Sequence, residues 1–127
     1  MANNKGARSK GGRAEALLQS QLINKGYEVR RTHLSAFPDI IAWNNSQILL
    51  IEVKLRTLNK ARTNRKTIVN SALRMFNNSA NELKVVHNDA DLLFYLRIDD
   101  EWNVYKWSPS GTIAVSYTHL TLPTNRE

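Results

Sequence analysis

The sequence predicts an α/β fold, in which a mixed five-stranded sheet is flanked by helices in the order helix, three strands, helix, two strands. Two observations support this prediction. Apolar residues recur at three- and four-residue steps in two stretches, as in amphipathic helices, and short apolar or alternating runs between turn residues are typical of strands. With 127 residues, the chain has the length of one domain and can bury enough apolar surface to fold.

Helical periodicity begins at Arg13 and is predicted to end at Gly26, since glycine commonly terminates helices. The apolar face of this first helix consists of Ala14, Leu17, Leu18 and Leu22. A second amphipathic helix is predicted after Lys66, with an apolar face made of Ile68, Val69, Ala72, Leu73, Phe76, Ala80 and Leu83. Each helix therefore has one face with which to cover a sheet.

Five segments are predicted to be strands because they are short, apolar or alternating, and bounded by turn residues: 27–32, 40–43, 48–54, 92–98 and 102–107. The turn residues Asn44, Asn45 and Ser46 separate the second strand from the third, which predicts a hairpin. Four consecutive apolar residues precede Glu52 in the third strand, so we expect this strand to be buried on both faces.

The two ends of the chain are predicted to lie outside this domain. Residues 1–12 are polar and rich in Gly, Asn and Lys, which predicts a basic flexible arm. Residues 116–127 resemble the translation of a sequencing-library adapter read through into an open frame, which predicts a non-native tail. The predicted globular domain is therefore 13–115.

Charge and composition narrow the classes of function. Eighteen Lys and Arg against eleven Asp and Glu give a net charge of +7, which favours polyanionic partners, above all nucleic acid, although a generic basic protein has the same charge. The absence of cysteine excludes disulfides, thiolate metal sites and cysteine nucleophiles. No apolar run approaches the ~20 residues of a membrane span, and the N-terminus lacks the apolar core of a secretory signal. We therefore expect a cytoplasmic protein that does not bind membranes.

One constellation of side chains points to chemistry. Asp39 opens the second predicted strand, and Glu52 and Lys54 lie near the end of the third. In an antiparallel hairpin the start of one strand lies beside the end of the other, so we expect these side chains to meet. Two converging carboxylates repel each other, and Mg²⁺ or Mn²⁺, which prefer oxygen ligands, would relieve that repulsion. Taken singly, a Pro-Asp pair is common at the start of a strand, and a Glu-x-Lys pattern is common where a strand runs out into solvent.

Glu15 adds a third carboxylate, at the edge of the apolar face of the first helix, where an acid could also simply face solvent. Glu15, Pro38-Asp39 and Glu52-Val53-Lys54 together resemble the signature of the PD-(D/E)xK nuclease superfamily. Residues 10–54 are more closely similar to the archaeal-type Holliday junction resolvases and their viral relatives, in step at Lys10-Gly11, Ala14-Glu15, Lys25-Gly26-Tyr27, Arg31 and Ile51–Lys54. Beyond Lys54 the similarity is one of element order.

The sequence departs from these resolvases at two places. They usually carry an arginine directly after the helix glutamate, where this chain has Ala16. Their serine-containing loop before the aspartate is matched by Thr32 and Ser35, but His33 and Leu34 are not the usual residues. Both departures bear on the choice of a junction as substrate more than on nuclease chemistry, because restriction, homing and repair nucleases share the same acids and lysine.

The resemblance implies a restriction-endonuclease-like fold and a Mg²⁺-dependent endodeoxyribonuclease, with Mn²⁺ as a substitute and no small-molecule cofactor. It implies that Asp39, Glu52 and the Val53 backbone carbonyl bind the metal, with Glu15 acting through a metal-bound water. Lys54 would orient the attacking water or stabilise the developing negative charge. The implied substrate is branched DNA, such as a four-way junction, cut by an intracellular homodimer of viral, archaeal or bacterial origin.

Basic residues around these acids are expected to contact DNA phosphates, which give affinity without sequence information. The predicted contacts are Arg13, Arg30, Arg31, Ser35, Arg56, Lys60, Arg62, Arg65 and Lys66. For any one lysine or arginine of the loop that includes Lys60 and Arg62, a solvated surface position is the alternative.

Three other functions compete with junction resolution. The chain could be a restriction- or homing-type nuclease that cuts duplex DNA, or a catalytically inactive nucleic-acid-binding module of the same fold. It could also be a basic structural protein in which the four residues coincide by chance. The complete set of acids and lysine argues against the inactive module, because a decayed site usually loses a member.

Overall fold

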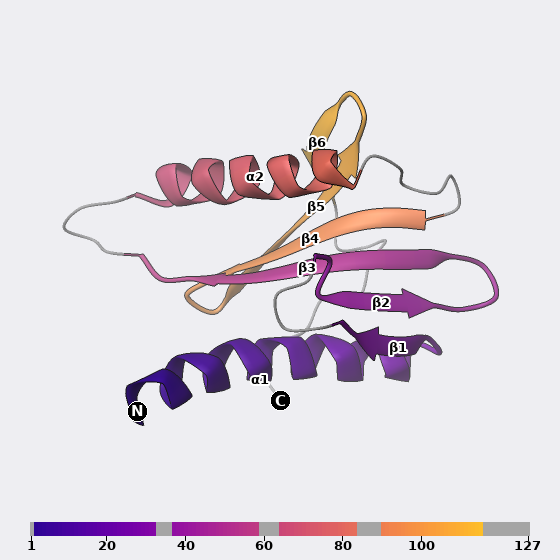
Figure 1. Ribbon diagram of the computed structural model, residues 1–127, viewed down its shortest axis with the longest axis horizontal. Coiled ribbons are helices and arrows are strands. Elements are labelled where there is room, and N and C mark those ends of the chain that lie inside the picture. Colours follow the sequence, from indigo (N-terminus) through magenta and orange to yellow (C-terminus); the bar gives the residue numbers. More distant parts are fainter. Residues whose placement is uncertain (1, 33–36, 59–63, 84–89, 116–127) are drawn as a thin grey trace.

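The computed structural model describes residues 2–32, 37–58, 64–83 and 90–115, with side chains described from Arg13 onward. Its elements are α1 (Ala2–Asn24), β1 (Glu28–Arg31), β2 (Ile40–Trp43), β3 (Ile48–Arg56), α2 (Arg65–Glu82), β4 (Ala90–Ile98), β5 (Glu101–Ser108) and β6 (Gly111–Ala114). The predicted α/β class is confirmed, with six strands in place of five. Figure 1 shows the sheet lying between α1 on one face and α2 on the other.

The strands of the sheet lie in the order β1-β2-β3-β4-β5-β6. Strands β3 and β4 pair in parallel, and every other neighbouring pair is antiparallel. The predicted hairpin of β2 and β3 is confirmed, with Ile40 opposite Ile51 and Trp43 opposite Ile48. Asn44 closes its turn, because its side-chain oxygen accepts hydrogen bonds from the backbone N–H groups of Ser46 and Gln47.

Two separate apolar cores lie on the two faces of the sheet. On the α1 face, Leu18 and Leu22 pack with Ile51 and Val53 of β3. On the α2 face, Phe76 packs with Phe94 of β4, and their rings stack at 4.8 Å between centroids and 7° between planes. Since successive side chains of a strand point to opposite faces, β3 contributes to both cores, as expected for a strand buried on both sides.

The start of α1 corrects the prediction of a flexible arm over 1–12, because the helix begins at Ala2. Residues 2–12 show no apolar periodicity, so the prediction from periodicity had the helix begin at Arg13. A helix nucleated by its packed half can extend into such a segment, since propagation needs no apolar face and no proline interrupts it. The predicted end is confirmed: Gly26 follows α1 with φ 93°, a conformation that glycine adopts without strain.

Strand β6 is the element that the sequence did not predict. It is short, its only partner among the described strands is β5, and its one large apolar side chain, Ile113, is 61% exposed. The turn before it is closed by the Ser108 hydroxyl, which donates to the Gly111 carbonyl at 2.7 Å. An edge strand without a buried face carries no alternating pattern by which it could be recognised.

Helix α2 begins at a side-chain cap, which yields a first prediction. The Asn64 side-chain oxygen accepts a hydrogen bond from the backbone N–H of Thr67 at 2.9 Å, so one unpaired N–H of the first turn is satisfied. We expect Asn64→Ala to lower the free energy of unfolding by about 1 kcal/mol. Urea denaturation would measure this change, and Asn64→Asp, which keeps the acceptor, should be close to wild type.

Candidate active site

Asp39 is held at the junction of β1, β2 and β3. The backbone N–H of Thr32 donates to the Asp39 carbonyl at 2.9 Å, and the Thr32 hydroxyl donates to the carbonyl of Pro38. The Asp39 side chain accepts a hydrogen bond from the backbone N–H of Val53 at 2.9 Å. Asp39 therefore lies directly beside the Glu52–Lys54 segment, as the hairpin predicted.

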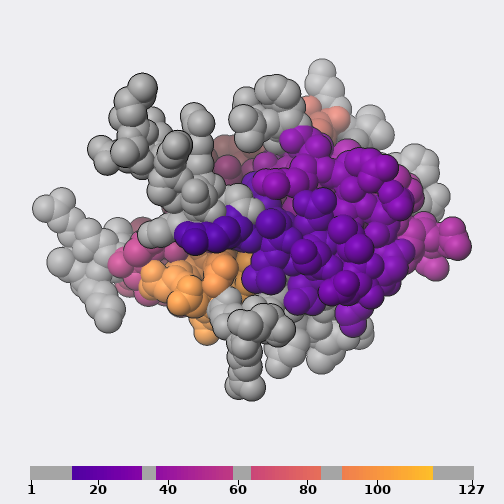
Figure 2. All heavy atoms as spheres, turned by 90° about the horizontal axis from the view of Figure 1, so that it is seen from below, coloured from indigo at the N-terminus to yellow at the C-terminus, as the bar shows by residue number. Residues whose placement is uncertain are grey.

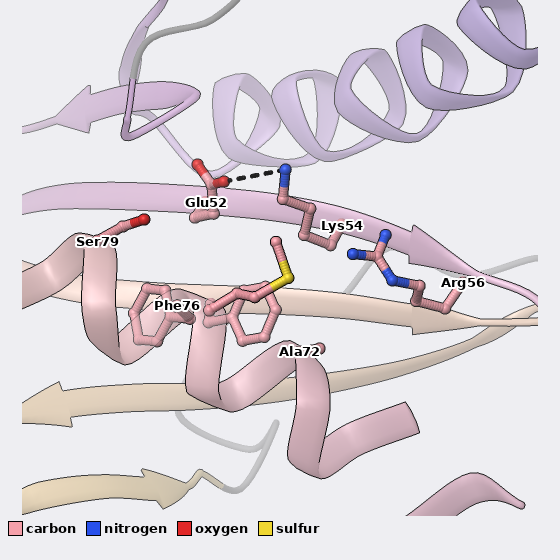
Figure 3. Close-up of a pocket in the computed structure, with 8 residues that line it drawn as sticks. Glu52, Lys54, Arg56, Ala72, Phe76 and Ser79 are labelled. Atoms are coloured by element: carbon pink, nitrogen blue, oxygen red, sulfur yellow. Dashed lines mark ion pairs between the residues drawn. The ribbon is translucent and has the colours of Figure 1, made fainter. Parts of the chain in front are cut away.

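Glu52 is the one buried charged residue in the described part of the chain, with 7% of its surface exposed. One of its carboxylate oxygens, Oε2, lies 3.4 Å from the ammonium nitrogen of Lys54, and the two side chains turn toward each other in Figure 3. The other oxygen, Oε1, is buried and has no hydrogen-bond partner among the residues that the structure describes. A buried acceptor without a partner is costly, so this oxygen marks a place where a ligand would be stabilising.

The environment of Glu52 disfavours its ionised form. The pKa of Glu52 is raised from 4.5 to about 7, mainly by burial and next by repulsion from Asp39, while the charge of Lys54 partly opposes the rise. A carboxyl group with this pKa is half protonated near neutral pH. A cation placed between Asp39 and Glu52 would favour the ionised forms of both.

A small pocket of about 70 Å³ opens beside these residues. Its lining from β3 is Glu52, Lys54 and Arg56, and its lining from α2 includes Ala72, Phe76 and Ser79 (Figure 3). The apolar period of α2 predicts a helix that packs on the core, and it gives no sign that this helix also lines the site. Four residues of α2 line the pocket, and their spacing places them on one face of the helix: Ala72, Met75, Phe76 and Ser79. Ser79 is a polar residue on this otherwise apolar face, and in the sequence it was the one sign that the face lines a site.

The donor set fits a hard divalent cation. Two carboxylates meet beside the unpaired Oε1 of Glu52, and oxygen ligands are those that Mg²⁺ and Mn²⁺ prefer. Among the residues that the structure describes, no three side chains of the His, Cys, Asp and Glu types form a potential metal-binding group. The metal ligands from this chain would therefore be Asp39 and Glu52, and the predicted contribution of the Val53 carbonyl stays a prediction.

Glu15 does not join the two acids as a third carboxylate. It lies on α1, which covers the opposite face of the sheet from α2, and its carboxylate forms an ion pair with Arg31 of β1. Arg31 is opposite Ile40, the residue after Asp39, so the ion pair lies next to the loop that carries Asp39. The predicted action of Glu15 through a water stays a prediction.

The basic residues predicted to contact DNA are distributed over several elements. Arg56 lies in the pocket lining with Lys54, while Arg13 on α1 and Lys66 on α2 are exposed. Arg30 pairs with Glu28 at 3.0 Å and lies over the ring of Trp43.

Arg65 is tied to β5 at the start of α2. It pairs with Glu101 and donates a hydrogen bond to the side-chain oxygen of Asn103 at 2.8 Å. Ser35, Lys60 and Arg62 lie outside the described residues.

A mixed sheet that brings an aspartate, a buried glutamate and a lysine together on two paired strands is the arrangement expected of PD-(D/E)xK nucleases. The sequence model of the archaeal Holliday junction resolvase (Hjc) family matches residues 6–106, and the chain belongs to this family. Among solved structures, Hjc of Archaeoglobus fulgidus, a Holliday junction resolvase from an archaeal hyperthermophile, is 22% identical over 90% of this chain and 91% of that chain, with a TM-score of 0.44. No curated protein matches the sequence. In the described part of the chain, no helix is both long and apolar enough to cross a membrane.

Proposed function

We propose that this protein is a metal-dependent endodeoxyribonuclease that hydrolyses phosphodiester bonds in DNA four-way junctions. The observation that carries the proposal is the buried Glu52, whose Oε1 has no partner in the described part of the chain and which lies beside Asp39 and Lys54. Membership of a Holliday junction resolvase family supports the choice of a branched substrate.

Asp39, Glu52 and the Val53 carbonyl would hold Mg²⁺, with Mn²⁺ as a substitute. When bound, the ion would polarise the scissile phosphate and lower the pKa of a nearby water. Asp39 is oriented for this task by the N–H of Val53, and Glu52 by the Lys54 ammonium. These contacts fix the direction of both carboxylates before any ligand binds.

Lys54 would stabilise the negative charge that develops on the phosphate. Its side chain is 41% exposed, while the Glu52 side chain that it contacts is 9% exposed, so the ammonium lies between the buried carboxylate and solvent. Arg56 lies two residues further along the same face of β3 and adds a second positive charge at the mouth of the pocket. Fixed cations of this kind, oriented before the reaction begins, favour the transition state electrostatically.

Symmetric resolution of a junction needs two cuts, so we propose that the working form is a homodimer with one site in each subunit. Junction cleavage by an obligate monomer, measured by sedimentation together with activity, would contradict this part of the proposal.

The central experiment compares labelled four-way junction, linear duplex and single-stranded DNA in Mg²⁺. We expect the junction to be cut and the other two substrates to remain intact, and we expect Asp39→Ala to remove the activity. Cutting of junction and duplex at equal rates would favour the duplex nuclease instead. Binding without cleavage in Mg²⁺ and Mn²⁺ would indicate an inactive binding module.

DNA binding is expected to weaken steeply with salt, because the contacts are to phosphates. With about four phosphate contacts, the affinity for junction DNA should fall about 100-fold between 50 and 200 mM salt. Fluorescence anisotropy with Ca²⁺ in place of Mg²⁺ would measure binding without cleavage. A flat response to salt would contradict the phosphate contacts.

A further inference from the structure

Arg56 lines two hollows of the molecule. One is the small pocket of the candidate active site, and the other is an open groove of about 670 Å³ at the C-terminal end of β3. The walls of this groove come from α1 and from the segment that ends β3: Arg13, Leu17, Leu55, Arg56 and Thr57. The remaining lining comes from the end of β4 and the turn after it, Arg97, Asp99 and Asp100, and Figure 2 shows the coloured part of α1, in indigo, beside the orange segment that contains this turn.

The groove carries a net positive charge, because Arg13, Arg56 and Arg97 in its lining outnumber Asp99 and Asp100. Asp99 accepts a hydrogen bond from the backbone N–H of Leu58 at 3.3 Å, and Asp100 pairs with Arg97 at 3.3 Å. Arg13 is exposed and has no ion-pair partner among the described residues. Arg56 donates from Nη1 to the carbonyl of Leu55 at 2.9 Å, and within the described part of the chain its other N–H groups are open to a ligand.

The groove also has the size and the surface that a nucleotide strand needs. Its volume lies in the range of sites that enclose a small organic molecule, whereas the active-site pocket of about 70 Å³ is too small for a nucleoside. Leu17 and Leu55 give an apolar wall for a base or a deoxyribose. Arg13 and Arg56 supply guanidinium groups, which suit phosphate oxygens.

We propose that this groove binds the DNA strand that leads away from the scissile phosphate, with Arg56 at the point where active site and groove meet. The proposal rests on the proposed nuclease function and specifies the path of its substrate. Arg13 would contact a phosphate further along the same strand, while Leu17 and Leu55 would contact the nucleoside between.

The first test compares a charge-removing variant on α1 with one just after this helix. Arg13→Gln removes a cation from the groove, and Lys25→Gln removes an exposed cation directly after the C-terminal end of α1. With four-way junction DNA in Ca²⁺, we expect Arg13→Gln to weaken binding about five- to tenfold and to lower the salt slope by about one. Arg13→Lys should restore much of the affinity, while Lys25→Gln should resemble wild type. Equal effects of Arg13→Gln and Lys25→Gln would overturn the proposal.

The second test uses the absence of cysteine in the chain. Thr57→Cys places a thiol in the groove, and Lys25→Cys places one directly after the C-terminal end of α1. Junction DNA with a disulfide-tethered base, placed one to four nucleotides from the cleaved phosphate, is the probe. We expect a cross-link to Thr57→Cys and none to Lys25→Cys. Cross-linking that is equal for the two variants, or absent from Thr57→Cys, would overturn the path.

These outcomes separate the groove from the proposed function. One outcome is that the wild type cleaves junctions while Arg13→Gln binds normally and Thr57→Cys forms no cross-link. That result would reject the proposed role of the groove and support the nuclease function. Absence of cleavage, with weakened binding by Arg13→Gln and a specific cross-link, would reject the nuclease and keep the groove as a DNA-binding site.

Discussion

Replacing Asp39 with asparagine is expected to lower the rate of Mg²⁺-dependent junction cleavage by about 10³-fold, because it removes one of two carboxylates that would hold the cation. Asparagine is nearly isosteric with aspartate, and its side-chain oxygen can still accept the hydrogen bond from the Val53 N–H. The loss should therefore arise from charge and not from misfolding. Single-turnover cleavage at saturating protein would measure it.

Asp91→Asn is the matched control for this experiment. Asp91 lies on β4, where it pairs with Lys106 at 3.3 Å, and it is not among the residues that line the active-site pocket. We expect this variant to cleave at the wild-type rate, and both variants to bind junction DNA in Ca²⁺. Cleavage by Asp39→Asn within tenfold of wild type would mean that Asp39 is not a metal ligand.

Glu52→Gln is expected to abolish cleavage and, at the same time, to stabilise the metal-free protein by about 2 kcal/mol at pH 8. The pKa of the Glu52 carboxyl is about 7 in the folded protein against 4.5 in the unfolded chain. The folded state consequently binds more protons between these values. The free energy of unfolding should fall as the pH rises from about 4.5 to about 7, and it should then level off. The glutamine side chain is neutral and carries no such dependence.

Urea denaturation across this pH range would measure the difference between Glu52→Gln and wild type. Glu28→Gln, at an exposed glutamate of β1, is the control and should leave the pH profile unchanged. Addition of Mg²⁺ at pH 8 should stabilise the wild type and not Glu52→Gln, since a ligand that binds the folded state raises its stability. A wild type whose stability rises between pH 5 and pH 7 by more than that of Glu52→Gln would contradict the raised pKa.

The hairpin of β2 and β3 explains why so much of the candidate site was predictable. A turn signal at Asn44 and two apolar runs of defined length determine the antiparallel register, and the register places Asp39 beside Glu52. Local pattern and short-range pairing are sufficient here because the acids belong to neighbouring strands. The same reasoning correctly located α2 and the end of α1 just before Gly26, although it placed the start of α1 too late.

The features that were not predicted depend on contacts between distant segments. Periodicity shows that α1 and α2 each have an apolar face, but it does not show which face of the sheet each one covers. The sequence therefore did not predict that Ser79 and Phe76 would line the pocket, or that Glu15 would pair with Arg31 in place of joining Asp39. The groove at Arg56 likewise forms because the β4–β5 turn lies beside the middle of α1.

The strand order of the sheet has a consequence for how the molecule assembles. Because each strand has its sequence neighbour as its spatial neighbour, four of the five pairings close short loops, and the conformational entropy lost in doing so is small. The parallel pairing of β3 with β4 must instead close the long connection that contains α2, and we expect this pairing to be the slow step of folding. Asp39, Glu52 and Lys54 all precede that connection, so their mutual arrangement is encoded in a local hairpin and does not wait for the late step.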